Sequence, residues 1–126
     1  MKGSYILLLK VNKSVNVKVG SLGVIKFKRG IYAYVGSAMN GIEARVRRHI
    51  KLNREKSGRL KWHIDYLLVN DHVRIVKVFF IPTRKRSECI VSKLLERKAI
   101  ETVRKFGSTD CKTCKGHLHY LGKDKI

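Results

Sequence analysis

The chain has 126 residues, and its 29 Lys and Arg against nine Asp and Glu give a formal net charge of +20 at pH 7. This length suits one domain that buries its core without disulfides, and 44% hydrophobic residues exclude a disordered basic tail as the source of the charge. A polyanion is the natural partner of such a domain. With no apolar run of the ~18 residues that a membrane span needs and no signal-peptide pattern, we expect a cytoplasmic protein without a membrane partner.

The first third of the chain alternates strand-like segments with short turns. Apolar or alternating runs predict strands over 5–11, 15–19, 24–28 and 31–35. Glycine and polar residues separate these runs, so we expect the strands to form an antiparallel meander.

The apolar spacing becomes helical after residue 41. Ile42, Val46 and Ile50 recur at four-residue intervals and predict the buried face of a helix. The other faces carry Arg45, Arg48 and His49. The charged segment 51–60 that follows predicts a loop.

The second half predicts two more helices and a strand. Residues 62–69 have the spacing of a short helix, in which we expect Trp62 to lie in the core, and 73–81 predicts the central strand of the sheet. Ser87 fits the N-cap of a long helix that ends near Phe106. Its buried stripe is predicted at Val91, Leu94, Leu95 and Ala99. These elements predict an α+β fold over residues 1–126, with a mainly antiparallel central sheet flanked by helices.

One strand end and the helix after it resemble the GIY-YIG nuclease superfamily, and the resemblance covers most of the chain. Tyr34-Val35-Gly36 matches the second tripeptide of the family name. Arg45 matches the family's helix arginine, and His49, one turn later, its helix histidine. In that family the two tripeptides lie on neighbouring antiparallel strands.

The first tripeptide has two candidates. Gly30-Ile31-Tyr32 spells it literally but lies on the same predicted strand as Tyr34. We therefore assign it to Gly3-Ser4-Tyr5, because the family geometry needs two strands and the tyrosine carries the chemistry. The extra hairpin between the two motif strands is then expected to form an outer ribbon.

The resemblance implies a metal-dependent endonuclease that hydrolyses DNA phosphodiesters. It implies that Tyr5 is the general base and that Tyr34 has a hydrogen-bonding or positioning role. It also implies that Arg45 contacts the scissile phosphate and that His49 assists proton transfer or binds phosphate. Such hydrolysis needs a base for the attacking water and positive charge where the phosphate oxygens gain charge. Because a tyrosine with a pKa near ~10 is a poor base at neutral pH, we expect arginines and a metal ion to lower that pKa.

Other residues of this region are expected to contact nucleic acid. They are Gly36, Ser37, Arg47, Arg48 and His63. The pairs Glu88-Cys89 and Asp110-Cys111, with the segment 62–67, resemble a microbial branch of the superfamily that is fused in some members to endonuclease III. The fusion implies a role in DNA repair, on damaged or branched DNA.

A catalytic Mg²⁺ or Mn²⁺ ion needs carboxylate oxygens, and the chain has only nine acidic residues. The resemblance places the ligand on the helix after the 73–81 strand. Glu88 is our first choice and Glu96, two turns further along the same face, is the alternative. Glu88 also suits an acid that only complements the helix dipole.

Three cysteines are too few for a closed disulfide framework. Two of them belong to a run of residues typical of metal ligands, namely Cys111, Cys114, His117 and His119. A zinc site usually joins two ligand pairs across a longer loop, so zinc, a redox-sensitive thiol pair and plain packing all stay open.

Two other functions compete with the nuclease. The same basic surface suits a noncatalytic module that binds DNA or RNA and in which the tyrosines only pack. Cys111 and Cys114 suit a zinc-stabilised interaction domain.

Overall fold

The computed structural model describes residues 2–85, 87–107 and 114–123. Its main feature is an antiparallel sheet of five strands in the order β5-β1-β4-β7-β6. These strands are β1 (Gly3–Val11), β4 (Gly30–Ala38), β5 (Val73–Pro82), β6 (Glu101–Val103) and β7 (Leu118–Gly122). The predicted α+β fold with a mainly antiparallel sheet is confirmed.

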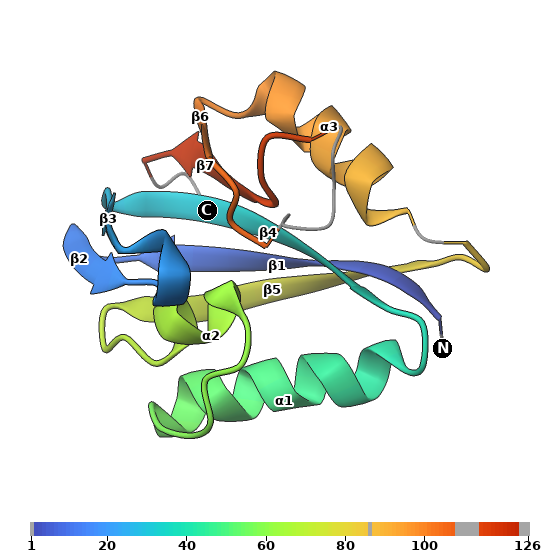
Figure 1. Ribbon diagram of the computed structural model, residues 1–126, viewed down its shortest axis with the longest axis horizontal. Coiled ribbons are helices and arrows are strands. Elements are labelled where there is room, and N and C mark those ends of the chain that lie inside the picture. Colours follow the sequence, from blue (N-terminus) through green and yellow to red (C-terminus); the bar gives the residue numbers. More distant parts are fainter. Residues whose placement is uncertain (1, 86, 108–113, 124–126) are drawn as a thin grey trace.

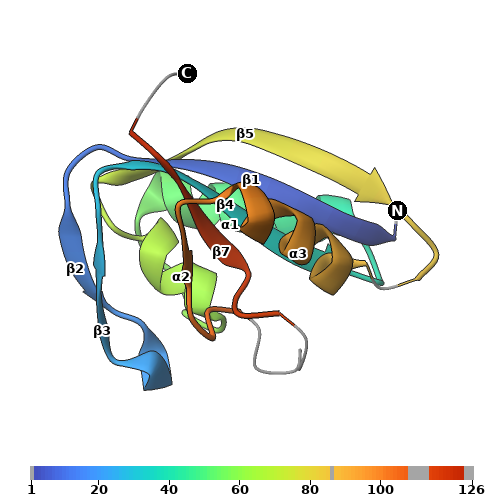
Figure 2. The same ribbon diagram turned by 90° about the horizontal axis from the view of Figure 1, so that it is seen from above.

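Helices cover both faces of this sheet. They are α1 (Ile42–Glu55), α2 (His63–Leu68) and α3 (Glu88–Lys98). Figure 1 shows α1 and α2 on one face and α3 on the other, and in Figure 2 α3 lies in front of the sheet and α1 behind it. Within the described ranges, no helix combines the length and apolar character needed to cross a membrane.

The strands β2 (Val15–Lys18) and β3 (Val24–Phe27) pair only with each other, around the short 3-10 helix η1 (Gly20–Leu22). They form a separate ribbon that projects from one end of the molecule (Figure 2). The expected outer ribbon between the two motif strands is therefore confirmed. The expected meander is wrong, because β1 pairs directly with β4.

Two of the three inner strands, β1 and β4, carry much of the core. Alternate residues of β1 are fully buried on the face that turns towards α1. In β4, eight of nine residues are buried because elements pack on both of its faces. The strand β5 has one neighbour, β1, so it is an edge strand and not the predicted central one. A strand-like composition indicates that the residues suit a half-buried pleated surface, and an edge strand has such a surface too. Composition therefore does not distinguish an edge strand from a central one.

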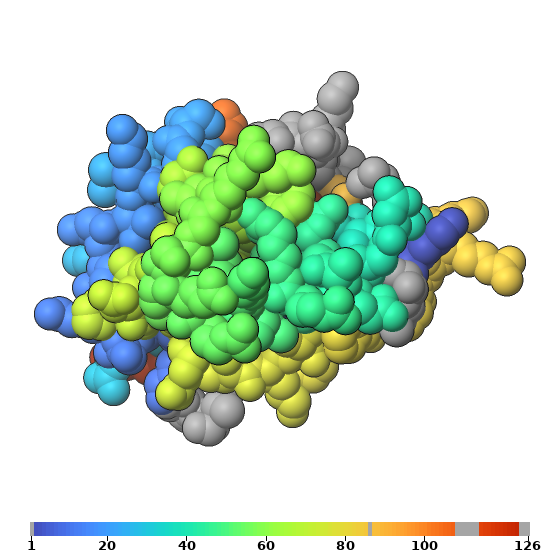
Figure 3. Space-filling view, turned by 90° about the horizontal axis from the view of Figure 1, so that it is seen from below, coloured from blue at the N-terminus to red at the C-terminus, as the bar shows by residue number. Residues whose placement is uncertain are grey.

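The helix α1 is longer than predicted and is rotated about its axis. It continues to Glu55, so the first part of the expected 51–60 loop is helical. Its buried residues are Ile42, Val46, His49, Leu52 and Asn53. Ile50, predicted to be buried, is 41% exposed. Figure 3 shows the face of the molecule on which α1 is exposed. A strict four-residue spacing drifts around a helix of 3.6 residues per turn, whereas the observed set stays on one face.

The helix α3 is shorter than predicted. It ends at Lys98, and the residues after it form β6, where the sequence predicted more helix. Ser87 precedes the helix as expected, but its hydroxyl bonds to Ser4 Oγ at 2.6 Å and does not cap the helix. Leu94 of the predicted buried stripe is 55% exposed, and Ser92 is the fully buried residue of α3.

We predict that Asn53 is a stabilising link between α1, α2 and β5. Its Nδ2 donates to the carbonyls of Leu68 and Val73 at 2.8 and 2.9 Å, and its Oδ1 accepts from the Ile75 amide at 3.0 Å. Asn53→Ala removes all three bonds, so it should lower the free energy of unfolding by about 2 kcal/mol or more in urea denaturation. The exposed Asn16→Ala is the control and should change it by less than ~0.5 kcal/mol. Equal effects of the two variants would contradict the role of Asn53.

Candidate functional site

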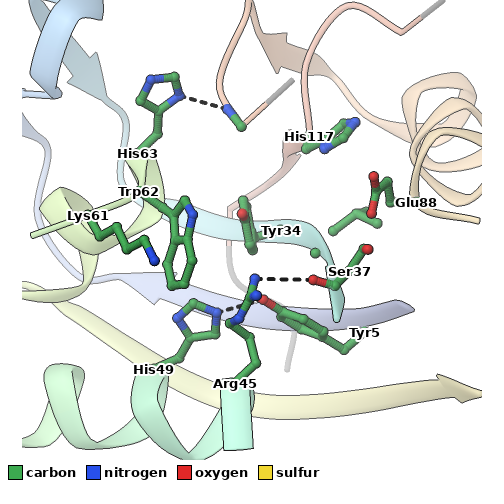
Figure 4. Close-up of a pocket in the computed structure, with 13 residues that line it drawn as sticks. Tyr5, Tyr34, Ser37, Arg45, His49, Lys61, Trp62, His63, Glu88 and His117 are labelled. Carbon is green, nitrogen blue, oxygen red and sulfur yellow. Dashed lines mark hydrogen bonds between the residues drawn. The ribbon is translucent and has the colours of Figure 1, made fainter. Parts of the chain in front are cut away.

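A cavity of about 290 Å³ lies where β1 and β4 meet α1, the start of α2 and the start of α3. Figure 4 shows side chains from all of these elements pointing into it. Eight of its lining residues are predicted site residues: Tyr5, Tyr34, Gly36, Ser37, Arg45, His49, His63 and Glu88. The sequence analysis missed Lys61, Gly107 and His117 as lining residues and placed Trp62 elsewhere. Arg47, Arg48 and Glu96 do not line the cavity.

The two assigned tripeptides face each other across neighbouring strands. Tyr5 of β1 pairs with Gly36 of β4, so the two tripeptides lie on neighbouring antiparallel strands. A Cβ atom on Gly36 would lie 2.3 Å from Cζ of the Tyr5 ring, so only glycine leaves room for that ring. Tyr32 lies on the same strand as Tyr34, donates to the Lys28 carbonyl at 2.9 Å and does not line the cavity. The expectations that Tyr5 lies on a strand next to that of Tyr34, and that Tyr32 shares the strand of Tyr34, are confirmed.

Tyr5 and His49 form a buried hydrogen bond between the sheet and α1. The Tyr5 hydroxyl lies 2.7 Å from His49 Nε2, and both side chains are almost fully buried. Burial lowers the pKa of His49 to about 4, so the imidazole is neutral at neutral pH. Among the described residues, His49 Nδ1 is the buried side-chain atom with no hydrogen-bond partner. Because an orphaned N–H is rarer in proteins than an orphaned acceptor, we assign the proton to Nε2, which then donates to Tyr5.

The electrostatic surroundings of Tyr5 differ from the expectation. Burial raises the pKa of the Tyr5 hydroxyl above its usual value of 10, and the nearby Arg45 guanidinium lowers it only in part. Burial also raises the pKa of Tyr34. The arginines of this cavity therefore do not by themselves make Tyr5 a base, because loss of hydration outweighs their charge.

Arg45 is held in place by contacts on two sides. Its Nη1 donates to the Ser37 carbonyl at 3.2 Å, and its guanidinium lies 4.2 Å from the centroid of the Trp62 ring. Trp62 packs against the core but is only half-buried, so it lies at the edge of the core and not within it. Its ring also contacts the cationic groups of Arg48 and Lys61.

Arg48 has a role in the fold that the sequence did not predict. Its Nη1 and Nη2 donate to the two carboxylate oxygens of Asp65 at 2.9 Å each. Asp65 is fully buried and also accepts from the backbone N–H groups of Lys61 and Trp62. Burial raises the pKa of Asp65, but these hydrogen bonds outweigh it and the net shift is downward. The pair fixes the loop that carries Trp62. Arg47, one residue earlier, is exposed.

Glu88 and two histidines form the rest of the cavity wall. Figure 4 shows Glu88 and His117 on the side away from His49. Glu88 is the carboxylate that lines the cavity within the described residues, whereas Glu96 accepts from the Lys115 amide at 3.4 Å, two turns along α3. His63 Nδ1 accepts from the Gly107 amide at 2.9 Å, and burial lowers the pKa of His63.

The cysteines and histidines that lie close together in the C-terminal sequence do not form one group in the structure. Cys111 lies outside the described residues. His119 turns into the molecule, with Nε2 2.7 Å from Ser92 Oγ and Nδ1 2.8 Å from Thr102 Oγ1. Cys114 and His117 instead lie beside Cys89 of α3, which the sequence analysis had not grouped with them.

Comparison with known proteins places the chain in a family. Residues 4–126 match the family described as "Domain of unknown function DUF123". The chain belongs to the DUF123 family. No curated protein matches it, and no solved structure does. The chemistry of this DUF123 domain must therefore be inferred from its cavity, where a buried hydroxyl, a fixed guanidinium and a carboxylate meet.

We predict that His49 makes the DUF123 domain sensitive to acid. Its folded-state pKa of about 4 lies below the ordinary value of 6.5, so between these values the unfolded chain binds the proton and the folded chain does not. The stabilising effect of neutral His49 is complete above about pH 6.5 and is lost as the pH falls towards 4. Urea midpoints measured from pH 7.5 to 4.5 should fall less steeply in His49→Gln. An unchanged slope in His49→Gln would contradict this assignment.

Proposed function

We propose that this domain is a metal-dependent nuclease that hydrolyses phosphodiester bonds of DNA, like the GIY-YIG nucleases that its sequence resembles. One observation carries the proposal: Tyr5 of β1, Arg45 of α1 and Glu88 of α3 line a single open cavity. These three residue types supply a base, a cationic phosphate ligand and a metal ligand, which are the groups that phosphodiester hydrolysis needs.

Arg45 is suited to bind the scissile phosphate. A guanidinium has five N–H donors, and the bond to Ser37 uses one of them. Stacking on Trp62 fixes the plane of the group, so little side-chain freedom is lost when a phosphate binds. Lys61 and His63 line the same cavity and add donors for neighbouring phosphates.

Tyr5 is suited to accept the proton of the attacking water once the site holds more positive charge. Because burial raises its pKa, the hydroxyl is protonated in the protein alone and must first release its own proton through the open cavity. Donation from His49 Nε2 and the charge of Arg45 then stabilise the phenolate. His49 acts in this scheme as a neutral hydrogen-bond donor to Tyr5.

The donor set fits a hard divalent cation. Mg²⁺ is often held by one or two carboxylates together with water and substrate phosphates, so Glu88 would hold Mg²⁺ or Mn²⁺ at the cavity wall. When bound, the ion supplies positive charge that lowers the pKa of nearby hydroxyl groups and neutralises charge on the phosphate. Its distance from the cavity makes Glu96 the weaker candidate.

The substrate is tested with purified protein and labelled linear, nicked, flapped and four-way DNA, with and without Mg²⁺ or Mn²⁺. Metal-dependent cleavage, strongest on nicked or branched DNA, is the expected result and fits a role in repair. Salt-sensitive binding without cleavage under all conditions would instead support a noncatalytic nucleic-acid-binding module, which the net charge of +20 also suits.

We predict that Tyr5→Phe slows cleavage by about 10²–10⁴-fold, the usual contribution of a general base, while DNA affinity stays almost unchanged. The substitution keeps the ring over Gly36 and removes only the hydroxyl that bonds to His49. Single-turnover cleavage and a binding titration measure the two effects. Tyr32→Phe is the matched control and should cleave normally, since Tyr32 does not line the cavity. The opposite pattern would assign the chemistry to Gly30-Ile31-Tyr32.

We predict that Glu88→Gln abolishes metal-dependent cleavage and leaves the melting temperature almost unchanged, because an amide is nearly isosteric but a weaker ligand for a hard cation. Cleavage assays over a range of Mg²⁺ and Mn²⁺ concentrations, with thermal melts, provide the measurement. Glu96→Gln, on the same helix but outside the cavity, should remain active. If Glu88 only complements the helix dipole, Glu88→Gln should cost about 0.3–1 kcal/mol of stability and leave cleavage intact.

A further inference from the structure

Three sulfur and nitrogen ligand atoms gather between α3 and the segment before β7. The sulfur atoms of Cys89 and Cys114 are 3.6 Å apart. His117 Nε2 lies 3.1 Å from Cys114 Sγ and 3.9 Å from Cys89 Sγ. Cys114 and His117 lie close together in the sequence, but Cys89 joins them only through the fold.

The spacing of these atoms is that of ligands around one ion. The sulfur atoms of Cys89 and Cys114 are further apart than the about 2.05 Å of two bonded sulfurs, so these two cysteines are not bonded to each other. Zinc binds thiolate at about 2.3 Å and imidazole at about 2.0–2.1 Å, which in a tetrahedron separates the ligand atoms by roughly 3.5–3.8 Å. The three observed separations, 3.6, 3.1 and 3.9 Å, lie around that range.

We propose that Cys89, Cys114 and His117 bind a zinc ion. Two thiolates and an imidazole favour zinc over Mg²⁺ or Mn²⁺, which prefer oxygen ligands. This site is therefore distinct in chemistry from the carboxylate of Glu88. It also differs from a site built only from the C-terminal run, because it includes Cys89 and leaves out His119.

Hydrogen bonds hold the backbones of both ligand segments in place. Ser92, one turn after Cys89, donates from Oγ to the Gly116 carbonyl at 2.8 Å. The His117 amide donates to the Phe106 carbonyl at 2.8 Å, and the His117 carbonyl accepts from the Val35 amide at 2.9 Å. The ligands are thus supported before an ion arrives, which is typical of selective metal sites.

A zinc ion bound here would attach α3 to the rest of the domain, which the few apolar contacts of this helix do only weakly. Ser92 is the fully buried residue of this helix, whereas Ile90 and Leu94 are 65% and 55% exposed. A bound metal that bridges two segments contributes its binding free energy to folding. We therefore expect zinc to stabilise the attachment of α3 to the C-terminal segment.

The same ion would fix part of the cavity wall. Cys89 directly follows Glu88, and His117 itself lines the cavity. Zinc would thereby hold Glu88 at a set distance from Tyr5. This positioning role rests on the proposed function, whereas binding of the ion does not.

The test begins with the full chain, expressed with added zinc and desalted. Elemental analysis should find about one zinc per chain, and cobalt replacement should give the visible absorption of a tetrahedral ion with thiolate ligands. A strong chelator should remove the metal and lower the melting temperature. A chain that takes up neither zinc nor cobalt, or peptide mapping that finds Cys89 or Cys114 in a disulfide with any other cysteine, would overturn the proposal.

Variants identify the ligands. Cys89→Ser, Cys114→Ser and His117→Gln should each lose most of the zinc. His72→Gln is the control and should retain it, because His72 does not belong to this group of ligands. Retention of full zinc content and the cobalt spectrum in Cys89→Ser would overturn the assignment. If these variants do not fold, the cobalt spectrum and chelator melt of the wild type still decide. All readouts are independent of cleavage, so a zinc-bound protein that cuts no DNA would refute only the nuclease.

Discussion

The candidate site depends on the close approach of the Tyr5 ring to the backbone of Gly36. Any Cβ at position 36 would overlap that ring, so the glycine determines where the tyrosine hydroxyl can lie. The antiparallel register then directs the hydroxyl to His49 on α1, at 2.7 Å. One small residue on a central strand therefore connects the sheet, the first helix and the cavity, and the proposed chemistry requires all three to keep this arrangement.

Burial competes with charge throughout this site. The chain has a net charge of +20, yet the pKa of Tyr5 is raised and that of His49 is lowered, in both cases mainly because of burial. Arg48 belongs to an ion pair with buried Asp65, while Arg45 is directed to the cavity by Trp62 and Ser37. The total charge thus favours association with a polyanion, and local packing decides which cations reach one phosphate.

Two adjacent residues of α3 are proposed to bind two different metal ions. Glu88 offers an oxygen to the cavity, and Cys89 offers a sulfur to Cys114 and His117. Oxygen ligands suit the labile Mg²⁺ or Mn²⁺ of phosphodiester chemistry, and thiolates with imidazole suit a tightly held zinc. At the start of α3, Cys89 would then attach the helix to the C-terminal segment through zinc, while Glu88 would hold the ion used in catalysis.

The sequence by itself determined the fold class, the outer ribbon and the residue types that line the cavity, because strand alternation, turn residues and short motifs are local signals. It misplaced β5, Ile50 and the end of α3, since local composition does not reveal which strand gains a second neighbour or how a helix is rotated. Only the tertiary structure decided that Arg48 pairs with Asp65 and that Cys89 joins His117. These contacts join residues far apart in the chain, and packing of the whole sheet brings them together.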